Sequence, residues 1–170
     1  MFENIKKLEP GTAMILKDSK IIKKWQYYDI SFDNVNKKIS QEDAIFKTRS
    51  LIKEAVKRQL ISDVPVGAFL SGGLDSTSIV AFAKEHYIPN NLETYTIDFE
   101  GEAKSIEGSP GDIFYAKRAA EYLDVKLNIL KVNPAMISDI KDMIYYLDEP
   151  QADPAAINTM LISQYAKKNN

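Results

Sequence analysis

Hydrophobic and polar positions change their spacing several times along the 170-residue chain, and each change marks a predicted element. In residues 40–60 apolar side chains recur at helical spacing behind Ser40, a good N-cap residue, and acidic residues fill the first turn. From residue 64 onward, short apolar runs alternate with amphipathic stretches. The apolar runs predict strands at 64–70, 92–98 and 125–132, and the amphipathic stretches predict helices at 76–86, 112–123, 134–147 and 154–168.

Strands that alternate with helices predict an α/β fold, in which a parallel sheet carries helices on both faces and right-handed crossovers join its strands. Ligands of such sheets bind at the carboxyl ends of the strands. A functional site is therefore expected where the predicted strands end.

The first 30 residues have a different pattern. Short strand-like pieces at 12–16, 21–22 and 25–30, with a turn at 18–20, predict a β-hairpin. Residues 31–39 are polar and include Asp33, Asn34 and Asn36, so they are interpreted as a linker. We find no internal repeat and no low-complexity tract.

Composition narrows the functional classes. Net charge is −2, from 22 basic and 24 acidic residues, and this balance argues against nucleic-acid and anionic-membrane partners. Cysteine is absent and His86 is the single histidine. This composition argues against Ser–His and Cys–His catalysis and against thiolate zinc sites. No apolar run approaches the roughly 20 residues of a membrane span, and no signal-peptide core follows the N-terminus. We expect a cytoplasmic protein.

The loop at residues 71–76, Ser-Gly-Gly-Leu-Asp-Ser, carries the clearest chemistry. A predicted strand enters it and a predicted helix leaves it, so backbone N–H groups and the positive end of the helix dipole converge there. Gly72 and Gly73 allow a sharp turn and a close approach to a ligand. The carboxylate of Asp75 would repel a phosphate. Its presence in the loop is explained if a Mg²⁺ ion lies between the carboxylate and the phosphate.

The spacing differs from that of better-known phosphate loops. No lysine follows the glycines as in the Walker loop, the three-glycine dinucleotide pattern is missing, and Phe69 occupies the first glycine position of a nucleophile elbow. A simple Gly-Gly turn is the alternative interpretation. The six residues together, between a strand and a helix, favour nucleotide binding.

The loop resembles the S-G-G-x-D-S signature of the PP-loop ATP pyrophosphatases. Three longer segments, residues 62–76, 94–99 and 147–157, resemble the synthetase domain of glutamine-hydrolysing asparagine synthetases. Residues 4–29 resemble the last hairpin of the glutaminase domain of that family. The resemblance covers nearly the whole chain and implies an adenine-nucleotide alpha-hydrolase-like fold.

The resemblance implies a function as well. It implies ATP-dependent conversion of aspartate to asparagine through an acyl-adenylate, with release of AMP and pyrophosphate and with ATP and Mg²⁺ bound. The substrates implied are ATP, aspartate, and ammonia or glutamine. The resemblance is also compatible with a homo-oligomer. Two alternatives stay open: a related amide-forming enzyme, such as a β-lactam synthetase or peptide cyclase, and a non-catalytic nucleotide-binding fragment.

Site residues follow from the resemblance position by position. Pyrophosphate binding is assigned to the loop residues Ser71, Gly72, Gly73, Asp75 and Ser76. Asp75 is assigned to Mg²⁺, with Asp112 as a second candidate ligand. The backbone of Leu70 and the side chain of Ile97 are assigned to the adenosine, although Ile97 could equally be a core residue.

Four carboxylates have structural alternatives. Asp112 could be a helix N-cap, and Asp148, Glu149 and Asp153 could belong to a capped helix junction instead of bordering the substrate pocket. The catalytic residue itself stays unassigned.

The chain also departs from the family pattern. The family glutaminase uses an N-terminal cysteine, whereas position 1 is Met and position 2 is Phe. We therefore expect three segments: the C-terminal hairpin of a glutaminase domain at 1–30, a linker at 31–39 and the N-terminal part of the synthetase domain at 40–170. The chain is expected to be a piece of a longer enzyme, with ammonia made by a domain absent from it.

Overall fold

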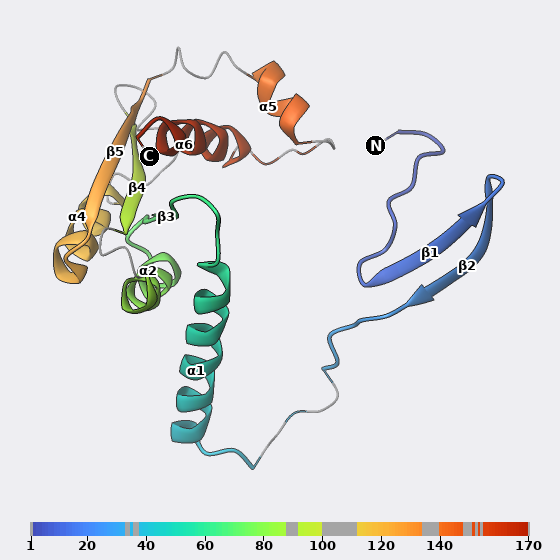
Figure 1. Ribbon diagram of the computed structural model, residues 1–170, viewed down its shortest axis with the longest axis horizontal. Helices are drawn as coiled ribbons and strands as arrows, with labels where there is room; N and C mark the ends of the chain where they lie inside the picture. Colours follow the sequence, from blue (N-terminus) through green and yellow to red (C-terminus); the bar gives the residue numbers. More distant parts are fainter. Residues whose placement is uncertain are drawn as a thin grey trace. The chain divides into compact units, whose positions relative to one another are not determined.

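The computed structural model describes residues 2–32, 35, 38–87, 92–99, 112–133, 140–147, 151, 153 and 155–169 (Figure 1). The chain divides into two compact units, Met1–Asp43 and Ala44–Asn170.

The first unit contains an antiparallel hairpin of β1 (Thr12–Lys17) and β2 (Lys20–Gln26). Asp18 and Ser19 form its turn with φ of 49° and 60°, as a tight hairpin turn requires. The predicted hairpin is confirmed, but the prediction of strand through residue 30 is wrong. Because β1 begins at Thr12, the chain after Gln26 has no strand to pair with, and the amides of Tyr27 and Tyr28 instead donate to the carbonyl of Gly11.

The second unit contains a parallel sheet of three strands in the order β3-β4-β5, as the alternating pattern predicts. These strands are β3 (Gly67–Phe69), β4 (Glu93–Phe99) and β5 (Lys126–Val132). The strand β3 is shorter than the predicted 64–70. Pro65 has no N–H to donate, and the amide of Val66 donates to the hydroxyl of Tyr87 at 3.0 Å, so neither extends the ladder.

The helices of the second unit lie close to their predicted ranges. They are α1 (Gln41–Gln59), α2 (Leu74–His86), α4 (Asp112–Leu123), α5 (Ile140–Tyr146) and α6 (Ala155–Asn169). Ser40 caps α1 as expected, because its Oγ accepts from the amide of Asp43 at 3.0 Å. The predicted start of the α5 helix, at 134–139, lies outside the described residues.

Helices cover both faces of the sheet, which confirms the predicted architecture. One buried cluster joins the sheet to α1, α2 and α4 and contains Val56, Leu70, Val80, Ala83, Leu92 and Ala120. A second cluster joins the sheet to α6 and contains Tyr95, Leu130, Val132, Leu161 and Ile162. Tyr95, Ile97 and Phe99 of β4 pack with the α6 cluster. Thr94 and Thr96, which alternate with them along the strand, are buried on the opposite face of the sheet.

Candidate functional site

The loop 71–76 leaves the sheet at its carboxyl edge. The amide of Leu70 donates to the carbonyl of Tyr95 at 2.9 Å, which carries the pairing of β3 with β4 one residue beyond the strand. The chain then turns at Gly72 and enters α2 through Gly73, its N-cap. The loop therefore connects the end of β3 to the N-terminus of the 13-residue helix α2.

Gly72 is required by the geometry of the loop. Its φ is +82°, and a Cβ atom there would lie 2.3 Å from the amide nitrogen of Ala116 and 2.4 Å from the carbonyl carbon of Tyr115. The loop thus packs directly against the backbone of α4. Gly73 differs, because its φ is −70° and the nearest atom to an added Cβ would be Ser71 Oγ at 3.5 Å. Only Gly72 needs the conformational freedom that the sequence suggested for both.

The two serines hold the shape of the loop. Their hydroxyls lie 3.0 Å apart, the amide of Ser71 donates to Ser76 Oγ at 3.3 Å, and Ser76 Oγ donates to the carbonyl of Gly73 at 3.2 Å. Because the N-cap of α2 is a glycine, no N-cap side chain accepts from the first-turn N–H groups. An anionic ligand is the partner that such a helix terminus favours.

Asp75 lies exposed in the first turn of α2. Within the described residues, no three Asp, Glu, His or Cys side chains gather in a group that could hold a metal ion. An exposed carboxylate in the first turn of a helix could hold Mg²⁺ together with water and the phosphates of a ligand, which is the usual way in which nucleotide sites bind it.

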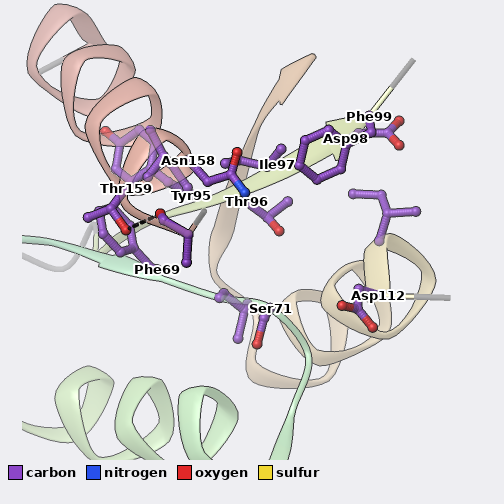
Figure 2. Close-up of a pocket in the computed structure, with 14 residues that line it drawn as sticks. Phe69, Ser71, Tyr95, Thr96, Ile97, Asp98, Phe99, Asp112, Asn158 and Thr159 are labelled. Atoms are coloured by element: carbon purple, nitrogen blue, oxygen red, sulfur yellow. Dashed lines mark hydrogen bonds between the residues drawn. The ribbon is translucent and has the colours of Figure 1, made fainter. Parts of the chain in front are cut away.

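A cavity of about 290 Å³ opens beside the loop at the carboxyl end of β4 (Figure 2). Four elements or their flanking residues line it: the end of β3, the end of β4, the start of α4 and the first turns of α6. In Figure 2, Phe69, Tyr95 and Thr159 lie on one side, Asp98, Phe99 and Asp112 on the other, and Ser71, Thr96, Ile97 and Asn158 between them. The lining thus combines apolar surface with hydroxyl, amide and carboxylate groups, as small-molecule sites do.

Four residues of the predicted site line this cavity, namely Leu70, Ser71, Ile97 and Asp112. Leu70 is fully buried, and its side chain packs in the core. Ile97 is half-buried and also packs against the α6 cluster, as the predicted core role requires, while its contact with adenosine stays a prediction. Asp112 is the first residue of α4. Gly72, Gly73, Asp75 and Ser76 belong to the adjoining loop and are not part of this lining.

Sequence reasoning missed the α6 side of the cavity and the end of β4. Asn158 and Thr159 come from the first turns of α6, and no motif distinguishes them from other polar residues of a helix. Thr96, Asp98 and Phe99 could have been found, because the rule that ligands bind at carboxyl strand ends applies to β4 as well as β3.

The remaining acidic candidates divide into two groups. Asp153 caps α6, since its Oδ1 accepts from the amide of Ala155 at 2.9 Å, so the structural alternative holds for this residue. Asp148 and Glu149 lie outside the described residues. In the described part of the chain, no helix is long and apolar enough to cross a membrane.

Comparison with known proteins places these features in context. The Asparagine synthase family model matches residues 47–170. The chain is 34% identical over 169 residues to glutamine-hydrolysing asparagine synthetase 1 of Bacillus subtilis strain 168, covering 98% of this chain and 25% of that protein. It is 27% identical over 179 residues to the amidase chry2 of Gibberella zeae, covering 96% and 26% of the two chains. The chain therefore spans about a quarter of the length of these curated relatives.

A solved structure shares the fold. The glutamine-dependent NAD⁺ synthetase from Acinetobacter baumannii, in complex with ADP, matches with a TM-score of 0.52 and 18% identity, over 79% of this chain and 26% of that one. This likeness agrees with the predicted parallel sheet of the PP-loop type and, at this identity, concerns the fold alone.

Proposed function

This chain belongs to the asparagine synthase family, and we propose on that premise that it is the ATP-binding part of a ligase that converts aspartate to asparagine. The observation that supports this most directly is the loop 71–76, in which a glycine-capped helix N-terminus adjoins the cavity at the end of β4. A site built in this way suits a ligand with a polyphosphate at one end and an apolar ring at the other.

The proposed reaction has two steps. A carboxylate oxygen of aspartate attacks the α-phosphorus of ATP, and the bond from that phosphorus to the oxygen bridging to the β-phosphorus breaks, so that pyrophosphate leaves. Ammonia then attacks the acyl carbon, AMP leaves, and loss of a proton gives the amide. Such transfers depend on positioning and charge stabilisation more than on covalent chemistry by the protein.

The proposed roles follow the geometry. The first-turn N–H groups of α2 face the pyrophosphate end of ATP, while the Leu70 backbone and the Ile97 side chain contact the adenosine. Ser71 lines the cavity and belongs to the loop, so it lies between these two regions. Asp75 would hold Mg²⁺, with Asp112 as a second candidate, and the ion would neutralise charge on the departing pyrophosphate.

Ammonia is proposed to come from glutamine by way of a domain outside these residues. The 170 residues contain no cysteine, so a cysteine-dependent glutaminase has no nucleophile among them. Residues 1–30 are proposed to be the terminal hairpin of that domain, with a linker at 31–39 and the synthetase part at 40–170. The hairpin forms part of a compact unit of its own, which supports this division.

A different carboxylate is the second candidate substrate. Relatives named amidases, from Gibberella zeae and Penicillium rubens, each cover 96% of this chain. The nucleotide chemistry would be shared, and only the acceptor would differ.

The direct test incubates the chain with Mg-ATP, aspartate and ammonium and measures AMP, pyrophosphate and asparagine. Pyrophosphate release with aspartate supports the proposal, and release only with other carboxylates supports the second candidate. ADP and phosphate as products would contradict both. ATP binding without turnover would favour the non-catalytic alternative.

The binding site is tested separately by calorimetry. We expect Asp75→Ala to weaken Mg²⁺-dependent ATP binding at least tenfold, because the ion loses its protein ligand, while the circular dichroism spectrum stays unchanged. Asp142→Ala, at an exposed carboxylate in the first turn of α5, is the matched control and should bind ATP normally. Equal affinity in the Asp75 and Asp142 variants would contradict the assigned site.

A further inference from the structure

Asp98 lines the cavity, and its carboxylate has no role in the chemistry described so far. Asp98 is the last but one residue of β4 and is half-buried. Among the residues that the structure describes, its carboxylate makes no hydrogen bond or ion pair. A partly buried charge that has no partner among the described residues favours a ligand that donates hydrogen bonds to it.

The position of Asp98 in the sheet indicates which ligand group it meets. The strand β4 is the hydrogen-bonded neighbour of β3, whose carboxyl end forms the glycine loop, so Asp98 and the loop share one edge of the sheet. In dinucleotide-binding sheets an acidic residue, roughly 20 residues after the glycine loop, accepts hydrogen bonds from the ribose hydroxyls. Asp98 follows the glycines of this loop at a comparable separation.

The neighbours of Asp98 support the same assignment. Ile97 and Phe99, on either side of it in β4, belong to the α6 face of the sheet and line the same cavity, so they provide apolar surface for a base across the strand from Asp98, while the loop is the site for phosphates. A carboxylate would repel the phosphates, and the donors that adenosine offers it are the exocyclic amino group of the base and the hydroxyls of the sugar. The sugar, which lies between base and phosphates and carries two neighbouring hydroxyl donors, is the part of a nucleotide that suits it.

Asp112, the other carboxylate of the lining, is a weaker candidate for this role. It lies at the first residue of α4, where the N-terminal end of the helix stabilises its charge. Figure 2 shows both carboxylates on the same side of the cavity, so substitution of Asp112 is a control matched in charge and location.

We propose that Asp98 is a specificity residue, whose carboxylate accepts hydrogen bonds from the ribose 2′- and 3′-hydroxyls of the bound nucleotide and selects ribonucleotides over deoxyribonucleotides. This inference rests on the proposed ATP-binding function. It adds a residue and a selectivity that the loop itself does not provide.

The test compares binding of ATP, 2′-deoxy-ATP and 3′-deoxy-ATP, each with Mg²⁺, by calorimetry on the full chain. We expect the unaltered chain to bind ATP roughly tenfold more tightly than either deoxy analogue, as loss of one hydrogen bond to a charged group implies. Asp98→Ala should lose affinity for ATP and bind all three with similar affinity. Asp98→Asn keeps the shape but not the charge, and should retain only part of the preference.

Asp112→Asn is the control and should keep the preference for ATP over both analogues, whatever its effect on overall affinity. An unaltered chain that binds all three nucleotides equally would overturn the role of Asp98 and leave the ATP site intact. If Asp98→Ala weakened the binding of all three nucleotides by the same factor, the role of Asp98 would be overturned as well. An unaltered chain that binds none of them would instead contradict the proposed function. Circular dichroism of each variant establishes that it is folded.

Discussion

At the scale of single residues, Gly72 and Gly73 show how two identical neighbours take different roles. Gly72 combines a left-handed φ of +82° with backbone atoms of α4 within 2.4 Å of any added Cβ. We expect Gly72→Ala to lower the free energy of unfolding by about 2–3 kcal/mol, because both strain and a backbone clash result. Urea unfolding measures this change, and calorimetry should show loss of ATP binding.

Gly73→Ala is the matched control for that substitution. Its backbone is already extended and only a side-chain atom lies near, so we expect a change of no more than about 1 kcal/mol. A larger loss at Gly73 than at Gly72 would contradict the geometry of the loop. The sequence motif does not distinguish the two glycines, because the contact with α4 joins segments some 40 positions apart in the chain.

Glu93 shows how a charge that does not line the cavity stabilises the sheet. Its carboxylate accepts from Lys126 Nζ at 2.7 Å, from Asn128 Nδ2 at 3.0 Å and from the Tyr95 hydroxyl at 3.1 Å. The hydrogen bond from Lys126, the largest cause, lowers the pKa of Glu93, although burial opposes it. The carboxylate therefore joins β4 to β5 at the amino edge of the sheet.

The lowered pKa of Glu93 predicts a pH dependence. Because the folded pKa lies below the unfolded value, the stabilisation is fully present above the ordinary glutamate pKa of about 4.3 and is lost as pH falls through the folded pKa. We expect the free energy of unfolding of Glu93→Gln to be about 1 kcal/mol lower than that of the unaltered chain at pH 7. At a pH below both the folded and the unfolded pKa, the two free energies should be equal. Urea unfolding across this range measures the difference. Glu54→Gln, at an exposed position on α1, is the control and should change the free energy of unfolding at pH 7 by less than about 0.5 kcal/mol.

At the scale of elements, the periodicity of the sequence predicts the three parallel strands and the helices between them, because each element buries one face or stripe against its neighbours. The errors occur where a local interaction competes. Pro65 and the hydrogen bond from the Val66 amide to the Tyr87 hydroxyl shorten β3, and β2 ends at Gln26 because β1 begins at Thr12. Residues of α6 that line the cavity were not predicted, because the helical spacing of apolar residues does not show which other element each turn of the helix faces.

The contact between α4 and the loop gives a prediction at this scale. Ala116 is fully buried, and its backbone nitrogen lies where a side chain on Gly72 would be. We expect Ala116→Leu to destabilise the fold by about 1–3 kcal/mol, because the larger side chain moves α4 away from the loop. ATP affinity should fall with it.

Urea unfolding and calorimetry test the role of Ala116, with Lys117→Leu as the control at an exposed neighbouring position of α4. The control should change the free energy of unfolding by less than about 0.5 kcal/mol. Normal ATP binding by a folded Ala116→Leu variant would show that the loop does not depend on the position of α4.

At the scale of the whole molecule, the fold class follows from the sequence more readily than the site does. The order of strands and helices is local information, whereas the cavity joins Ser71, Ile97, Asp112 and Asn158 from segments that meet only after the sheet has formed. The loop residues were found because their chemistry is contiguous. Asp98 was not predicted, because no motif marks it and only its place near the carboxyl end of β4 brings it to the cavity.

The division of the chain into two units leads to the last prediction. Polar residues at 31–39 are interpreted as a linker, and every residue that lines the cavity belongs to the second unit. A chain shortened to residues 40–170 keeps Ser40, which caps α1. We therefore expect it to retain the ATP affinity of the full chain and its free energy of unfolding within about 0.5 kcal/mol, an effect no larger than that of a surface substitution. Calorimetry and urea unfolding measure both. A tenfold loss of affinity would show that residues 1–39 contribute to the nucleotide site, and a loss of stability alone would show that the hairpin supports the sheet without touching the ligand.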